Sequence, residues 1–167
     1  MPVVVIRHIS EALEHNPLGD PHERKLACIV PDDLDPEQPV PVLWYLCGYA
    51  GIGAGMLPHD PWQEGLEERL IRLRAEGLVG PMIVALPDCF TKYGGSQFVS
   101  SPAHGDYEGY LYELRDAVEA KWNVSGHGIA GKSSGGFGAI VHAMRWPGKY
   151  RAVACHSGDM GFRLAFT

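Results

Sequence analysis

The chain has 167 residues, of which 46% are hydrophobic and 20% are charged, and its formal net charge at pH 7 is −6. This length suffices for one domain with a sizeable core over residues 1–167, and the composition is typical of globular proteins. The acidic balance gives no electrostatic reason to bind nucleic acid or an anionic membrane surface, so neither is expected as a partner.

The cysteines are far apart in the chain and form no C-x-x-C pair. They are Cys28, Cys47, Cys89 and Cys155. Each lies in or just after an apolar run, where a free cysteine behaves as a small hydrophobic residue. This predicts reduced thiols and a cytoplasmic location. No pair of residues has the spacing of a structural zinc site, so neither a metal nor a cofactor is expected.

Apolar runs alternate with helical patterns along the chain. We expect strands at residues 3–9, 25–30, 40–46, 82–86, 127–130 and 151–155, and helices at residues 61–78, 106–122 and 135–146. Alternation of this kind predicts an α/β fold, with a mostly parallel sheet and helices on both of its faces. Ligands then bind at the carboxyl ends of the strands, which carry residues 47–49, 87–88, 132–133 and 156–157.

The segment GHGIAGKSSGG, residues 126–136, fits two chemical patterns. From Gly126 it reads G-x-x-x-x-G-K-S, the phosphate loop of nucleotide-binding proteins, in which Ser133 would hold magnesium. A phosphate loop requires a strand that ends before its first glycine. Here the strand-like residues 127–130 would themselves have to form the loop, which disfavours nucleotide binding.

From Gly131 the same segment reads G-x-S-x-G, the nucleophile elbow, in which a serine lies on a tight turn between a strand and a helix. The context agrees, because a predicted strand precedes Gly131 and a predicted helix begins at Gly135. The helix N-terminus would stabilise negative charge near the serine. The pattern also arises by chance in glycine-rich chains, but in this context it predicts Ser133 as a catalytic nucleophile.

A glycine-rich loop, LCGYAGIG at residues 46–53, follows an earlier buried strand. Acyl transfer passes through an oxyanion that needs two backbone N–H donors. Ser134, directly after the nucleophile, is expected to supply one donor and Tyr49 the other. Without Ser133, the same loop would be interpreted as a flexible turn.

Four segments together resemble the putative-esterase family of the α/β-hydrolases, the group of esterase D, S-formylglutathione hydrolase, enterochelin and feruloyl esterases and the mycolyltransferases. They are YLCGYAG at residues 45–51, ALPDCFTKYGGSQF at 85–98, AGKSSGGFGA at 130–139 and ACHSGD at 154–159. The resemblance implies an α/β-hydrolase fold and an enzyme that cleaves small carboxylic esters through an acyl-enzyme on Ser133. Cys47 stands where the family usually has a histidine, which matters little because a main-chain N–H does the work.

The family pattern continues beyond this chain, with the acid and then the histidine after the serine. We therefore expect the chain to be the N-terminal two-thirds of the fold, with the C-terminal strands, the acid and the base outside it. Its last strand would then be an exposed edge that permits self-association.

Two histidines and one aspartate follow Ser133 in the chain and are candidates for the base and the acid. His142 lies about two and a half helical turns from the serine, which indicates a surface or packing role. His156 is expected to border the pocket, because it lies at the end of a strand on the same edge of the sheet. A stiff strand end is a poor place for a mobile general base. Asp159 stands where some lipases keep their acid, although a helix cap or loop anchor is the commoner role.

Further residues could line a pocket at this edge. They are Cys47, Gly48, Lys132, Tyr93 and Ser96, in addition to His156 and Asp159. Those of the loop at 88–100 have an equally good alternative role in folding the loop on itself. Two other functions stay open: a non-catalytic binding or assembly module, and an acyltransferase that uses the same acyl-enzyme.

Overall fold

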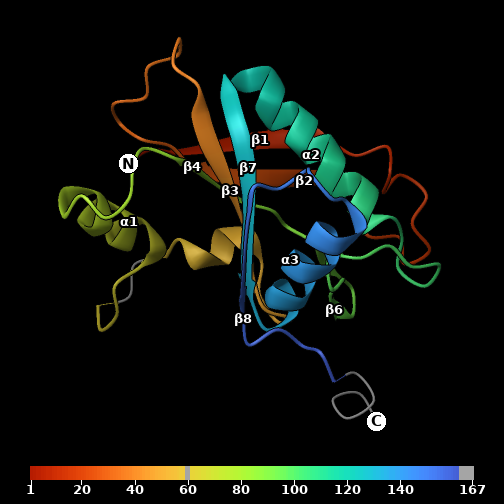
Figure 1. The fold of residues 1–167 in the computed structure, drawn as a ribbon. Helices are drawn as coiled ribbons and strands as arrows, with labels where there is room; N and C mark the ends of the chain where they lie inside the picture. Colours follow the sequence, from red (N-terminus) through yellow and green to blue (C-terminus); the bar gives the residue numbers. More distant parts are fainter. Residues whose placement is uncertain (59–60, 162–167) are drawn as a thin grey trace.

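A computed structural model describes residues 1–58 and 61–161. Within these residues one sheet has six strands in the order β1-β2-β4-β3-β7-β8 (Figure 1). Their bounds are β1 Val3–Ile9, β2 Glu23–Ile29, β3 Val40–Leu46, β4 Ile83–Leu86, β7 Val124–Lys132 and β8 Ala152–His156. Strands β4, β3, β7 and β8 are parallel, while β2 is antiparallel to both of its neighbours. The predicted mostly parallel sheet is confirmed.

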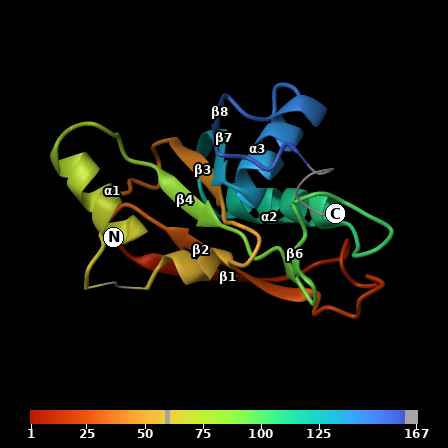
Figure 2. The ribbon, with the colours of Figure 1, turned by 90° about the horizontal axis from the view of Figure 1, so that it is seen from below.

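Helices cover both faces of the sheet, also as predicted. Helix α1 (Leu66–Ala75) lies on one face, and α2 (Tyr107–Lys121) and α3 (Ser134–Arg145) lie on the other (Figures 1 and 2). The alternation of side chains along each strand produces the two cores. In β2, Leu26 and Cys28 belong to the core under α2 and α3, whereas Ala27 and Ile29 belong to the core under α1.

Some element boundaries differ from the predicted ones. Helix α1 begins at Leu66 rather than at residue 61, because Gly65 has an extended backbone and its N–H is bonded to the Glu68 carboxylate (2.9 Å). Strand β7 begins at Val124 and therefore passes through Gly126. The turn η1 (Gly53–Met56) and the two-stranded ribbon of β5 (Phe90–Thr91) and β6 (Gly94–Gly95) had no expected counterpart.

The parallel register aligns the carboxyl ends of the strands at one edge of the sheet. Leu46, the last residue of β3, pairs with Gly131 of β7, and Lys132 pairs with His156 of β8. The segments that follow β3, β7 and β8 therefore meet at the same edge. Because β7 runs through Gly126, the residues that a phosphate loop would need are strand, and the nucleotide-binding interpretation has no structural basis.

Two glycines allow β7, α3 and the end of β3 to pack with their backbones in contact. A side chain at Gly131 would overlap the backbone of Gly135, and one at Gly135 would overlap the carbonyl group of Leu46. The third close approach is at η1, where a side chain on Gly53 would overlap the carbonyl group of Leu86. These contacts leave no room for a Cβ atom, so the turn at residues 131–135 depends on glycine.

The last strand, β8, lies at the edge of the sheet, and all five of its residues are exposed. Cys155 is consequently exposed, contrary to the expectation that every cysteine would behave as a hydrophobic core residue; Cys28, Cys47 and Cys89 are buried. The exposure of Cys155 follows from its place on an edge strand. No helix in the described part of the chain is long and apolar enough to cross a membrane.

His142, on α3, is fully buried against the segment that follows the β5-β6 ribbon. Its Nε2–H donates to the carbonyl oxygen of Phe98 (2.6 Å), and its Nδ1 has no partner among the described residues. This is the packing role expected from the sequence. Burial lowers the pKa of His142 below the ordinary value of 6.5, because the charged imidazolium would lose its hydration.

Replacement of Gly135 by alanine tests the backbone contact with Leu46. We expect Gly135→Ala to lower the free energy of unfolding by about 3 kcal/mol or more, because neither backbone segment can move without disturbing the sheet. For a chain of this size that corresponds to a fall in Tm of about 6–12 °C. Gly80→Ala is the matched control, since nothing lies within 4 Å of its Cβ position. Equal Tm values for the two variants would contradict the proposed contact.

The burial of His142 predicts a loss of stability in acid. The pKa of His142 is lower in the folded than in the unfolded state, so the unfolded state takes up the proton first as the pH falls. The free energy of unfolding should therefore be highest above pH 7 and should decrease below about pH 6.5. His142→Gln, which cannot titrate, should show a shallower decrease in denaturant titrations, and the exposed His15→Gln should show the wild-type slope. Some slope should remain in His142→Gln because burial also lowers the pKa of His127.

Candidate active site

Ser133 occupies the turn between β7 and α3 in a strained backbone conformation. Its φ and ψ angles are 55° and −122°, a region that residues with a side chain rarely adopt. The strain is maintained by the surrounding contacts of Gly131 and Gly135 and by a hydrogen bond from the Ser133 N–H to the His156 carbonyl (3.0 Å). Such conformations persist only where neighbouring structure overrides them, and they are common at functional sites.

The Ser133 hydroxyl is partly buried and donates to Oδ1 of Asp159 (3.2 Å). The Asp159 N–H in turn points to the carbonyl oxygen of Ser133 (3.4 Å). From the sequence, Asp159 could be a catalytic acid, a helix cap or a loop anchor. In the structure its carboxylate is in direct contact with the serine. His156 contributes its backbone only: its side chain is exposed and bonds to no described residue.

The loop after β3 passes beside the serine. The Cβ position of Gly48 lies 4.0 Å from Cβ of Ser133, so the backbone of this loop faces the turn. Ser134 is the first residue of α3, and the N–H groups at the start of a helix have no intrahelical acceptor. The two backbone segments from which oxyanion donors were expected, at Tyr49 and Ser134, therefore border the same serine.

Cys47 lies buried at the base of this loop. Its Sγ donates to the carbonyl oxygen of Gly51 (3.0 Å), and burial raises its pKa to about 11. The thiol is therefore protonated near neutral pH and cannot act as a thiolate nucleophile. The Cys47 side chain thus bonds across the turn of the loop.

The β5-β6 ribbon packs against the same loop. Gly95 donates its N–H to the Tyr49 carbonyl (2.8 Å), and the Tyr49 hydroxyl donates to the Tyr93 carbonyl (2.6 Å). Gly94 has φ 113° and lies under the Tyr49 ring, where a Cβ atom would be 2.5 Å from a ring carbon. The rings of Tyr49 and Tyr93 are 41% and 73% exposed, so both remain accessible at this edge.

Of the other predicted pocket residues, Ser96 is buried and serves the loop itself, since its Oγ accepts the N–H of Phe98 (3.2 Å). Lys132 is exposed at the end of β7. Gln97, the residue after Ser96, makes a contact that was not expected. Its Oε1 accepts a hydrogen bond from the Ser134 hydroxyl (2.8 Å). The amide nitrogen of Gln97 is buried and has no partner among the described residues. A polar side chain thus fixes the residue next to Ser133.

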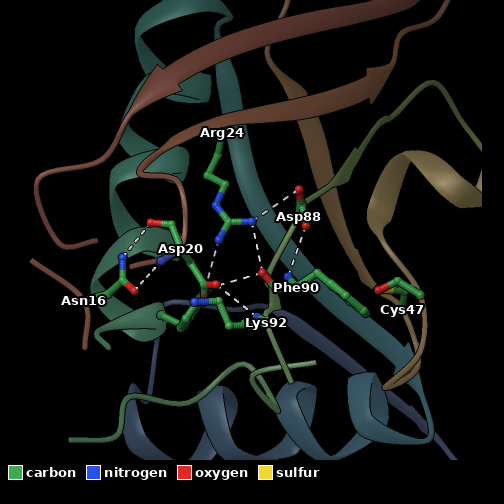
Figure 3. A network of polar contacts seen from close by, with 9 residues as sticks. Asn16, Asp20, Arg24, Cys47, Asp88, Phe90 and Lys92 are labelled. Carbon is green, nitrogen blue, oxygen red and sulfur yellow. Dashed lines mark hydrogen bonds and ion pairs between the residues drawn. The ribbon is translucent and has the colours of Figure 1, made fainter. Parts of the chain in front are cut away.

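A buried network anchors the loop that carries these residues (Figure 3). Arg24, on β2, is 7% exposed and donates to the Phe90 carbonyl (3.0 Å) and the Tyr107 hydroxyl (3.0 Å). The same guanidinium lies 3.5 Å from a carboxylate oxygen of Asp88. Because a buried charge is tolerated only when it is paired and hydrogen-bonded, this arrangement fixes the start of the loop after β4.

The network continues on the outer side of the loop through Asp20 (Figure 3). Its carboxylate accepts from the N–H of Lys92 (3.0 Å) and from the Tyr107 hydroxyl (3.2 Å), and its backbone is held by the side-chain amide of Asn16 (2.9 and 2.7 Å). Lys92 and Tyr107 are 72 and 87 residues from Asp20 in the chain, so no local pattern could have indicated these two contacts. The loop after β4, which lies at the same edge of the sheet as Ser133, is therefore fixed by buried polar contacts to Arg24 and Asp20.

No histidine side chain among the described residues bonds to Ser133: His142 is buried against Phe98, and the His156 side chain is exposed, although the His156 carbonyl accepts from the Ser133 N–H. No group of three or more possible metal ligands occurs in the described ranges. The site as described thus contains a strained serine, a carboxylate bonded to it, and two backbone segments beside it, the loop after β3 and the start of α3.

Comparisons with known proteins bear on the family and the fold of the chain. The model of a protein family described as "Putative esterase" matches residues 20–163. No curated protein matches the chain. A solved ferulic acid esterase superposes with a TM-score of 0.72 at 24% identity, and the alignment covers 89% of this chain and 57% of that one.

Two further structures show the same fold. A ferulic acid esterase of the anaerobic fungus Anaeromyces mucronatus has a TM-score of 0.69 at 21% identity, over 96% of this chain and 60% of that one. An S-formylglutathione hydrolase from Agrobacterium tumefaciens has a TM-score of 0.65 at 22% identity, over 89% and 55% of the two chains. The chain therefore spans a little more than half the length of these proteins. The family match covers most of its residues, and the chain belongs to the esterase family of α/β-hydrolase fold.

Proposed function

We propose that the chain carries the nucleophile half of a serine esterase site, with Ser133 as the residue that forms the acyl-enzyme. The single observation that supports this best is the strained backbone of Ser133 at the carboxyl edge of a parallel sheet. Membership of the esterase family and the similarity to structures named as ferulic acid esterases and an S-formylglutathione hydrolase support ester cleavage as the reaction class.

In the proposed reaction the Ser133 Oγ attacks the carbonyl carbon of a carboxylic ester. Its proton passes to a general base, and the carbonyl oxygen becomes an oxyanion that accepts hydrogen bonds from the backbone N–H groups of Ser134 and Tyr49. The alcohol then leaves with a proton, and an acyl group remains on Ser133. Water releases the acid in a second step. The N-terminus of α3 would stabilise the oxyanion electrostatically.

The general base is proposed to lie outside the described residues. A histidine is the usual base because its pKa is close to neutral pH, and the side chains of His142 and His156 make no hydrogen bond to the serine. Asp159 accepts the Ser133 hydrogen bond directly. It is well placed to hold the hydroxyl in one orientation while a base is absent, and we propose this anchoring role for it.

The acyl or alcohol part of the substrate is proposed to be apolar or aromatic. Tyr49 and Tyr93 present exposed rings beside the site, and no cationic side chain of the described residues lies within the loops at 46–53 or 93–98. Rings of this kind favour aromatic or aliphatic groups over highly charged ones.

A fluorophosphonate probe tests the proposed nucleophile. The probe should label Ser133 slowly, because a serine without a positioned base retains only the residual reactivity given by the oxyanion donors. Mass spectrometry should find the adduct on the peptide that contains Ser133, and Ser133→Ala should abolish it. Ser101→Ala, a change in a loop distant in sequence from the elbow, should label at the wild-type rate.

Two results would contradict the proposal. Labelling that persists in Ser133→Ala would place the reactive group elsewhere. A complete absence of labelling in the folded chain, after long incubation, would favour a binding or assembly module that retains the fold without the chemistry.

A further inference from the structure

A cavity lies at the opposite end of β7 from Ser133. Its volume is about 480 Å³, and it is bounded by the C-terminal part of α2, the first residues of β7 and the segment before β8. Nine residues of extended chain separate Val124 from Ser133, which corresponds to about 30 Å. The cavity is therefore independent of the proposed esterase site.

The wall of this cavity is rich in positive charge although the chain as a whole is acidic. Arg115, Lys149 and Arg151 line it, and Glu119 is the one carboxylate among its lining residues. This leaves a surplus of two positive charges in one place. Neither Lys149 nor Arg151 has an ion pair with any residue in the described ranges.

The single carboxylate is already engaged. Oε1 of Glu119 accepts from Nε of Arg115 (2.9 Å) and from Nε2 of His127 (2.7 Å). The tautomer of His127 follows from its other contact, because the Trp44 indole N–H donates to Nδ1 (3.0 Å) and so places the proton on Nε2. Burial lowers the pKa of His127, which keeps the imidazole neutral near pH 7.

Arg115 retains unused hydrogen-bonding capacity. Its Nε–H is bonded to Glu119, whereas its Nη1 is buried and lacks a partner among the described residues. A buried donor without an acceptor costs free energy, and the positive charge of this guanidinium adds to the potential of the cavity that Arg115 lines. The side chain of Arg115 is 16% exposed, so part of the group is accessible from the cavity.

Gly126, on β7, lines the cavity together with Arg151. A Cβ atom at this position would lie 2.9 Å from Nε of Arg151, so the absence of a side chain lets the Arg151 guanidinium lie across β7. The backbone of Arg151 is fixed at this point by its N–H bond to the His127 carbonyl (2.8 Å). Two guanidinium groups and one ammonium group thus converge on a cavity that also has the Trp122 ring in its wall.

We propose that this cavity binds a small ligand through a phosphate group. Guanidinium groups bind phosphate with paired N–H donors, and a phosphate monoester carries a charge of about −1.5 to −2 near pH 7, which matches the surplus of two positive charges. A single carboxylate would neutralise only half of that surplus. The Trp122 ring offers an apolar surface to the remainder of the ligand.

Inorganic phosphate is the probe for this site. At constant ionic strength, phosphate should raise the Tm of the chain with the logarithm of its concentration, by about 3–6 °C at a tenfold excess over its Kd. Isothermal titration calorimetry should give one site per chain. Acetate at the same concentration should give a much smaller shift, which separates a phosphate site from a carboxylate site.

Charge-matched variants locate the site. Arg151→Ala and Lys149→Ala should each weaken phosphate binding by about tenfold, the effect of losing one charge-assisted hydrogen bond. Lys25→Ala, which removes an exposed lysine on β2, should bind as the wild type does. Ser133→Ala should also bind phosphate normally, and phosphate should leave the fluorophosphonate labelling rate unchanged, so failure of this site and failure of the esterase proposal are distinguishable.

Three results would overturn the proposal: a phosphate shift of the Tm no larger than that of acetate, no saturable binding in the calorimetric titration at millimolar phosphate, or an equal loss of binding in Lys25→Ala and Arg151→Ala. The last result would indicate a general charge effect. If Arg151→Ala is unstable on its own, Arg151→Lys keeps the charge but removes the paired donors, and it should still bind phosphate more weakly than the wild type.

Discussion

The backbone contact between Gly131, Gly135 and the end of β3 is the constraint on which the candidate active site depends. No Cβ atom fits at either glycine, so β7 can turn directly into α3 while remaining against Leu46. This close packing holds Ser133 in a conformation with positive φ. The same contact brings the loop at 47–53 beside the serine, because that loop continues from the strand against which the turn packs.

A second constraint acts from the other side of the site. Arg24 is buried, and its charge requires partners, which the loop after β4 supplies through Asp88 and the Phe90 carbonyl. The loop is thereby fixed at its beginning, and it is fixed further along by the Tyr49 contacts with Tyr93 and Gly95. Its other contacts reach α3, where Gln97 binds the Ser134 hydroxyl and the Phe98 carbonyl accepts from His142. Three loops from different strands are therefore tied into one rigid edge.

The two ends of β7 differ in their chemistry. Around its carboxyl end the exposed side chains are the Tyr49 and Tyr93 rings together with Lys132 and His156. At its amino end the exposed groups are cationic, and the one nearby carboxylate is bonded to Arg115 and His127. The nine residues of β7 separate these two ends of the strand. An ester and a phosphate-containing ligand would therefore bind to separate surfaces of the chain.

The sequence by itself determined the elements and the elbow. Apolar alternation located all six strands of the main sheet, β3 and β1 with their observed bounds, and the glycines around Ser133 identified its turn. These features depend on neighbours within a few residues, and local patterns report them. Only the tertiary structure decided the bond of Ser133 to Asp159, the bond of Gln97 to Ser134, the burial of Arg24 against Phe90 and the convergence of Arg115 with Arg151. Their partners lie 26 to 66 residues apart or on different elements, and such pairs are set by the strand order and the packing of helices rather than by any local pattern.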